Sequence, residues 1–174
     1  MASLVGPQEA MDLDEGMRNK MQAHQVGQVT GTSHGLYLGD QSGTGYGAST
    51  SQSVVLPEGF GSLLPHPLGA FLVGHELGHV ENNDVVRRFG RQQLEGSLRG
   101  TDLKDEVESL AARHDHEAEF AADQRGAEYA LAQGHAGPKV LEGFNRLLNL
   151  TQGEASASHP GTQERLQRLA DKLQ

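Results

Sequence analysis

The stretch Pro67-Leu-Gly-Ala-Phe-Leu-Val-Gly-His-Glu-Leu-Gly-His-Val80 decides how this chain folds. Its apolar residues flank the motif His75-Glu-Leu-Gly-His79 and predict a helix that is largely buried, and a proline suits the first turn of such a helix. We expect this helix to run from Pro67 to about Arg91. Residues four apart lie on one face of a helix, so the two imidazoles of the motif can reach the same metal ion.

The motif also supplies a base for metal-assisted hydrolysis. Glu76 lies beside the two histidines and can reach a water molecule bound to the metal. Zinc lowers the pKa of such a water, and a carboxylate can then take its proton. A ligand set of two imidazoles and a third ligand that is a carboxylate favours zinc over other divalent ions. The motif therefore predicts a zinc peptidase that binds one zinc ion per chain, with Glu76 as general base. A purely structural role is disfavoured, because burying these polar groups without partners is unfavourable.

A catalytic zinc site needs a third protein ligand and an open position for water. The candidate is Glu119, and Asp123 lies one helical turn after it on the same face. One of these carboxylates can bind the metal while the other hydrogen-bonds a ligand histidine. Glu117 competes for the ligand role, but Ala121 stands four positions after it. Small residues around the acidic pair permit close packing of two helices.

The remaining sequence predicts one α+β domain over residues 1–174 that is mainly helical. Residues 1–25 predict an N-terminal helical segment. Residues 26–65 are rich in Gly, Ser and Thr and predict a small antiparallel sheet before the zinc-binding helix. Residues 66–174 form the helical catalytic part, in which further helices are expected at about residues 101–133, 138–150 and 162–173.

Composition excludes several other classes of function. The chain contains no cysteine, so disulfides and thiolate metal sites are impossible. Lys and Arg total 14 and Asp and Glu total 23, a formal net charge of −9, without a basic stripe, so nucleic acid is not expected as a partner. No apolar run is long enough to cross a bilayer. The N-terminus does not resemble a signal peptide, which indicates the cytoplasm, or the periplasm or exterior if an export signal was removed. Nothing indicates an oligomeric state.

Three blocks occur in a characteristic order. His75-Glu-Leu-Gly-His79 is followed by Glu119-x-x-x-Asp123-x-x-Gly126 and by Ser158-His-Pro160, and Arg165 comes six positions after the histidine of the last block. In this order and spacing the chain resembles the gluzincin metallopeptidases of the HtpX and CAAX-prenyl-protease type (metallopeptidase family forty-eight), especially their soluble members and the compact minigluzincins. The likeness covers about residues 54 to 170 and implies a zincin-like fold.

This resemblance implies a role for each matching residue. His75, His79 and Glu119 would be the zinc ligands, and Glu76 would act as base and then as acid toward the leaving amine. The substrate would be a peptide or an unfolded protein.

The resemblance also implies roles around the metal. Asp123 would hold a ligand histidine, and His159 and Arg165 would face the metal and stabilise the oxyanion. The family often carries an Asn-Ala edge strand ahead of the zinc helix. Here Gly45-Tyr-Gly-Ala48 stands in that place without the asparagine, although an extended peptide could still pair with this edge.

Three other hypotheses compete with an active endopeptidase. A non-catalytic metal-binding or chaperone-like module could keep the fold, although it would not need Glu76. A latent enzyme could use a terminal segment, such as residues 1–25, to cover its cleft. A regulatory protease of the ImmA type shares the zinc motif, but the histidine–proline block and the absence of a DNA-binding helix pair disfavour it.

Overall fold

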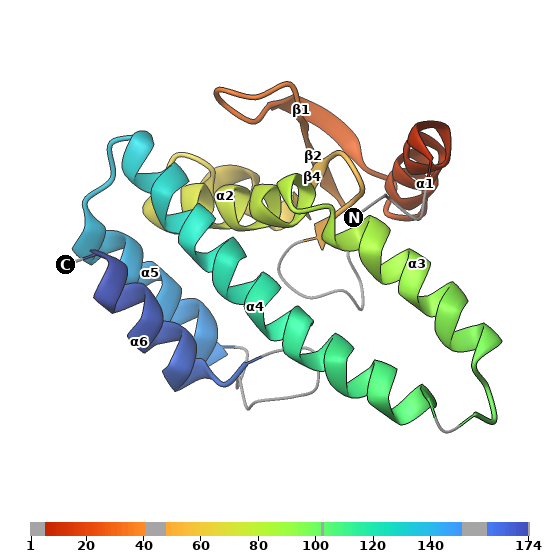
Figure 1. Ribbon diagram of the computed structural model, residues 1–174. Coiled ribbons are helices and arrows are strands. Elements are labelled where there is room, and N and C mark those ends of the chain that lie inside the picture. Colours follow the sequence, from red (N-terminus) through yellow and green to blue (C-terminus); the bar gives the residue numbers. More distant parts are fainter. Residues whose placement is uncertain (1–5, 41–47, 102, 151–159, 174) are drawn as a thin grey trace.

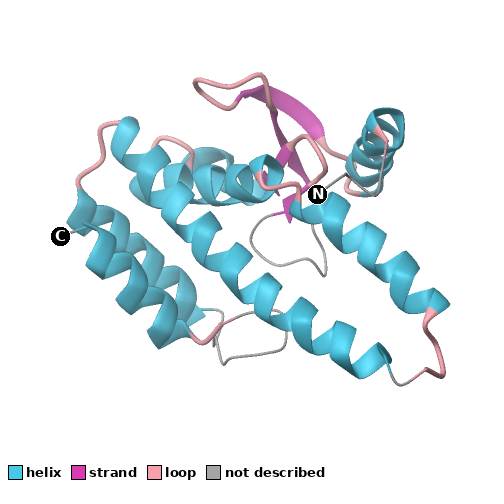
Figure 2. Ribbon diagram, viewed as in Figure 1, coloured by secondary structure: helices cyan, strands magenta, loops and turns pink. Residues whose placement is uncertain are grey.

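The computed structural model describes residues 6–40, 48–101, 103–150 and 160–173 (Figure 1). A short sheet precedes a mainly helical body, so the predicted α+β class is confirmed (Figure 2). The elements are α1 (Pro7–Lys20), β1 (His24–Gln28), β2 (Gly35–Gly39), β3 (Ala48–Ser49), β4 (Val54–Pro57), the 3-10 helix η1 (Glu58–Leu63), α2 (Pro67–Glu81), α3 (Asp84–Ser97), α4 (Leu103–Ala132), α5 (Gly137–Leu150) and α6 (Thr162–Leu173).

The sheet has the strand order β1-β2-β4-β3 and is mixed. β1 pairs antiparallel with β2, and β3 pairs antiparallel with β4. β2 and β4 run parallel, with Leu36 opposite Val54 and Leu38 opposite Leu56. The prediction of a wholly antiparallel sheet was therefore wrong in this pair. The chain between β2 and β4 is long enough to return in the same direction, which a parallel pair requires and a tight hairpin cannot provide.

Helix α2 lies in the middle of the molecule, between the sheet and α4 (Figure 1). Every residue from Gly69 to Val80 is buried. Phe71 and Leu77 belong to the same core cluster as Val54 and Leu56 of β4. A helix that contacts neighbours on all sides is apolar all round, which explains why the zinc motif stands within an almost continuous apolar stretch.

The helix predicted from Pro67 to about Arg91 is two helices, so that prediction was wrong. α2 ends at Glu81 and α3 begins at Asp84. Asn83 between them adopts φ of 56°, in the left-handed region that asparagine tolerates better than most residues. This break changes the chain direction and places the first residue of α3 beside the end of α2.

α2 and α4 pack closely through glycines. A Cβ atom at Gly74 would lie 2.4 Å from Tyr129 Cβ and 2.9 Å from Gly126 Cα. A Cβ atom at Gly78 would lie 2.9 Å from Ala122 Cα. The expected close approach of two helices around the acidic pair is confirmed, and only glycine permits it on the α2 side.

The other helices follow the predicted ranges closely. α4 ends at Ala132, and Gly134 beyond it has φ of 90°, as a helix stop requires. Leu169 of α6 is buried in the core, with Leu166 and Leu173 packed beside it. In the described part of the chain, no helix has both the length and the apolar composition needed to cross a membrane.

Candidate metal centre

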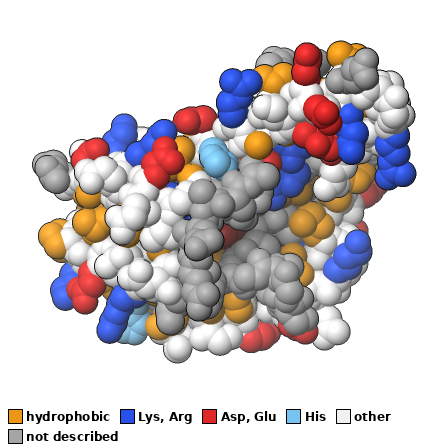
Figure 3. Space-filling view, turned by 90° about the horizontal axis from the view of Figure 1, so that it is seen from below, with side chains coloured by type: hydrophobic (Ala, Val, Ile, Leu, Met, Phe, Trp, Pro, Cys, Tyr) orange, Lys and Arg blue, Asp and Glu red, His pale blue; other side chains and the backbone are white. Residues whose placement is uncertain are grey.

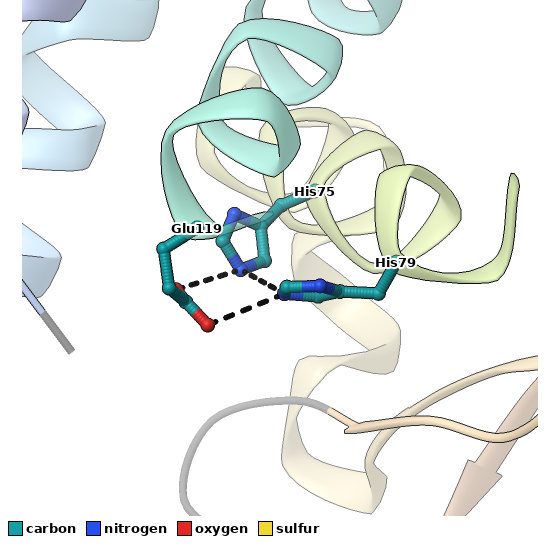
Figure 4. A group of neighbouring side chains, drawn as sticks. All are labelled: His75, His79 and Glu119. Carbon is teal, nitrogen blue, oxygen red and sulfur yellow. Dashed lines mark hydrogen bonds and ion pairs between the residues drawn. The ribbon is translucent and has the colours of Figure 1, made fainter. Parts of the chain in front are cut away.

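Three side chains converge where α2 crosses α4. His75 and His79 project from α2, Glu119 projects from α4, and all three are buried (Figure 4). The two imidazole Nε2 atoms lie 3.3 Å apart. Glu119 Oε2 lies 3.7 Å from His75 Nε2, and Glu119 Oε1 lies 3.4 Å from His79 Nε2. The predicted ligand residues are therefore brought together.

These spacings fit a zinc ion. Ligand atoms 2.0–2.1 Å from a tetrahedral ion lie about 3.3–3.4 Å from one another. The separations of 3.3, 3.4 and 3.7 Å between the three side chains approach that value. Glu117, the competing candidate, is excluded from this group because its side chain is 70% exposed and lies 3.6 Å from Arg168.

A carboxylate holds the far side of each imidazole. His75 Nδ1 lies 3.0 Å from Asp123 Oδ1, and His79 Nδ1 lies 2.9 Å from Asp84 Oδ2. A ring that donates from Nδ1 presents the lone pair of Nε2 to a metal, so both carboxylates favour the ligand tautomer. Asp123 was expected in such a contact, whereas Asp84 was missed. Two consecutive asparagines before Asp84 are the signal that a helix break could bring it back to the motif.

Arg165 lies on the Asp123 side of the group. Its Nε and Nη2 lie 2.8 and 2.7 Å from the two oxygens of Asp123, and Nη2 lies 3.4 Å from Glu119 Oε2. The guanidinium also stacks over the Phe144 ring, 5.3 Å from its centroid. Arg165 bridges two of the surrounding carboxylates, and its predicted role toward the metal and the oxyanion stays a prediction. His159, predicted beside it, lies outside the described residues.

Glu76 is buried next to the two histidines. Burial raises the pKa of its carboxyl group, and the charge of Glu119 adds to the rise, while His75, His79 and Arg88 oppose it. A carboxyl group with a raised pKa exchanges protons more readily near neutral pH than an exposed one.

His79 has strong electrostatic partners. Burial acts to lower its pKa, but the hydrogen bonds to Asp84 and Glu119 outweigh burial and raise the pKa to about 10. The surrounding carboxylates therefore stabilise a positive charge at this position. A divalent cation bound by the same atoms would satisfy that preference and displace the proton.

The sequence profile described as "Peptidase family M48" matches residues 45–173, most of the chain. The chain belongs to peptidase family M48. This membership confirms the family resemblance and implies a zinc-dependent metallopeptidase in general terms. The matched span includes α2, α4 and α6, which carry the converging side chains, and excludes α1, β1 and β2. The comparisons with curated proteins and with solved structures yielded no significant match.

Proposed function

We propose that this chain is a zinc-dependent endopeptidase, similar to the soluble minigluzincin-like members of the HtpX and CAAX-prenyl-protease type. The observation that carries the proposal is the convergence of His75, His79 and Glu119 at zinc-ligand spacing, with the buried Glu76 beside them. These three residues would hold one zinc ion. When bound, zinc would make a water molecule more acidic and polarise the scissile carbonyl group.

The residues of the chain would divide the remaining chemistry among them. Glu76 accepts the proton of the attacking water at its carboxylate and then passes it to the leaving amine. Burial, which raises the pKa of Glu76, suits a group that must both take and release a proton. Asp123 and Asp84 keep the ligand imidazoles in orientation and in the tautomer that binds metal.

We assign Arg165 a positioning role, while its contact with the oxyanion stays a prediction. Its strongest donors are engaged with Asp123, and its third contact is with the ligand carboxylate of Glu119. It would therefore restrain the third ligand and the carboxylate behind His75. The oxyanion role of His159 stays a prediction.

The substrate would enter along the sheet edge. β3, which begins at Ala48, is an outer strand and contacts α2. A peptide in extended conformation could add to this edge through main-chain hydrogen bonds. Residues 45–47 of the predicted edge lie outside the described residues.

The test compares casein cleavage and zinc content in wild type, Glu76→Gln and Glu117→Gln. We expect about one zinc per chain in all three proteins and cleavage by all but Glu76→Gln, because that variant keeps the ligands and loses the base. Glu117→Gln is the matched control, since it removes an exposed carboxylate from α4 two positions before the third ligand. Equal activity in Glu76→Gln would remove this residue from the mechanism, and a wild type without zinc would refute the proposal.

A further inference from the structure

A groove of about 310 Å³ lies between α3 and α4. Its α3 wall consists of Asp84, Arg87, Arg88 and Arg91. These positions are three or four residues apart, so they form one face of the helix. Figure 3 shows a hollow in the face seen from below, with hydrophobic and Lys or Arg side chains on its right, the side on which α3 lies in Figure 1.

The α4 wall is apolar at its outer end. Val107, Leu110 and Ala111 line it there, and Leu110 is 59% exposed. His114 and Asp115 line it further in, and Asp115 lies one helical turn before Glu119. A peptide in the outer part of the groove would therefore lie between arginines on one side and aliphatic side chains on the other.

Both walls begin at the candidate metal centre. The first residue of the α3 wall, Asp84, accepts a hydrogen bond from His79. The α4 wall continues within one turn to Glu119, which lies 3.4 Å from the same imidazole. The inner end of the groove therefore lies beside the candidate metal centre.

One arginine of the groove remains available to a ligand. Arg91 is engaged with Asp115 through two contacts of 3.1 Å. Arg87 forms an ion pair with Asp84 at 4.0 Å, and its Nη1 lies 3.4 Å from His114 Nε2. Arg88 is exposed, and no ion pair or hydrogen bond joins it to the rest of the described chain. A free cation at a groove is notable in a chain with a net charge of −9.

We propose that this groove holds the substrate on one side of the scissile bond, and that Arg88 binds an acidic side chain of the peptide. The proposal rests on the proposed peptidase function and adds a preference for Asp or Glu near the cleavage site. A guanidinium can bind a carboxylate with two parallel hydrogen bonds, which gives both affinity and selectivity. The aliphatic wall of α4 would contact the neighbouring residues of the peptide.

Arg88 also lies close to the candidate metal centre. It follows Asp84 by four residues on the same face of α3, and Asp84 accepts a hydrogen bond from His79. A residue that binds the substrate beside the scissile bond would occupy such a position.

The test measures peptide binding and peptide cleavage separately. Three matched libraries of fluorescent peptides, blocked at both ends, differ only in one fixed position, which is Glu, Gln or Lys. All other positions carry random uncharged residues. Binding is measured by anisotropy on the zinc-loaded Glu76→Gln protein, alone and combined with Arg88→Gln or Arg113→Gln. Arg113 is an exposed arginine of α4 outside the groove lining, so its variant changes the net charge equally.

We expect Glu peptides to bind about tenfold more tightly than Gln peptides at one position, the effect of one charge-assisted contact. Lys peptides should bind most weakly, and added salt should reduce the Glu preference. Arg88→Gln should abolish that preference, and Arg113→Gln should keep it. Equal binding of Glu and Gln peptides would overturn the inference, as would a preference that survives Arg88→Gln. The inference would also be overturned if the wild type were a dimer that Arg88→Gln dissociates, because a second copy of the chain would then occupy the groove. Failure of the zinc-loaded wild type to cleave any library would instead refute the peptidase function.

Discussion

Replacement of Gly74 by alanine should separate the two helices that bring the metal ligands together. The new Cβ would lie 2.4 Å from Tyr129 Cβ and 2.9 Å from the backbone at Gly126, whereas carbon atoms in contact prefer about 3.5–4.0 Å. α4 must therefore move by about 1 Å at this point, because neither obstacle is the free end of a flexible side chain. Overpacking of this kind typically destabilises a protein by about 1–3 kcal/mol.

A second glycine provides the matched control. Gly96 of α3 has nothing within 4 Å of the position of its Cβ. Alanine is the better helix former at either site, by about 1 kcal/mol, and this contribution cancels when the two variants are compared. The free energy of unfolding of Gly74→Ala should therefore be about 1–3 kcal/mol below that of Gly96→Ala. Each kcal/mol corresponds to about 2–4 °C in Tm for a chain of this size.

The same displacement should weaken zinc binding. Metal–ligand distances tolerate deviations of only about 0.2 Å, so a shift of α4 would draw Glu119 away from the two imidazoles. We expect zinc affinity, measured by competition with a chelator, to fall at least about tenfold in Gly74→Ala. Urea unfolding of the metal-free proteins gives the stability difference independently of the metal. If Gly74→Ala matches Gly96→Ala in both stability and zinc affinity, close helix packing does not set the ligand geometry.

Three further predictions concern groups around the centre. The raised pKa of about 10 keeps His79 protonated in the metal-free protein at pH 6–8, so zinc must displace one proton and the zinc affinity should rise about tenfold per pH unit. Asp84→Asn should weaken zinc binding about 10–100-fold and flatten this pH dependence in chelator competition. A zinc affinity that does not change with pH would contradict the raised pKa of His79. Arg165→Lys keeps the charge but loses the paired contact with Asp123, so zinc affinity should fall severalfold, and an unchanged affinity in the same assay would argue against positioning. Asp14, buried in α1, accepts hydrogen bonds from the turn at residues 50–53 beside β3. Asp14→Ala should therefore destabilise the protein by about 1–3 kcal/mol in urea unfolding and lower casein cleavage. A rise in casein cleavage would instead favour a latent enzyme restrained by α1.

The ligand residues could be predicted because their signals are local. The spacing of His75 and His79 on one helix, and of Glu119 and Asp123 on another, depends only on the helical repeat. The same holds for the helix limits near Pro67 and Gly134, where the backbone preferences of single residues decide. The helical content and the grouping of His75, His79 and Glu119 could therefore be predicted with little knowledge of how the other segments pack.

Local signals of this kind do not predict which distant segments of the chain contact one another. The parallel alignment of β2 with β4 and the contact of Arg165 with Asp123 join residues far apart in the chain. Alternative partners were equally compatible with the local pattern, and the choice depended on which surfaces the complete core could bury together. The sequence spacing therefore could not predict that Arg165 pairs with the buried Asp123.

By itself, the sequence determined which helices form and which side chains can bind a metal, because helix periodicity and backbone preference act within a few residues. Only the tertiary structure decided that the chain breaks at Asn83, that Asp84 returns to hold His79, and that α3 and α4 enclose a groove lined with arginine. Those features arise from the packing of whole helices against one another, and the energy of such packing resides in contacts that no short segment contains.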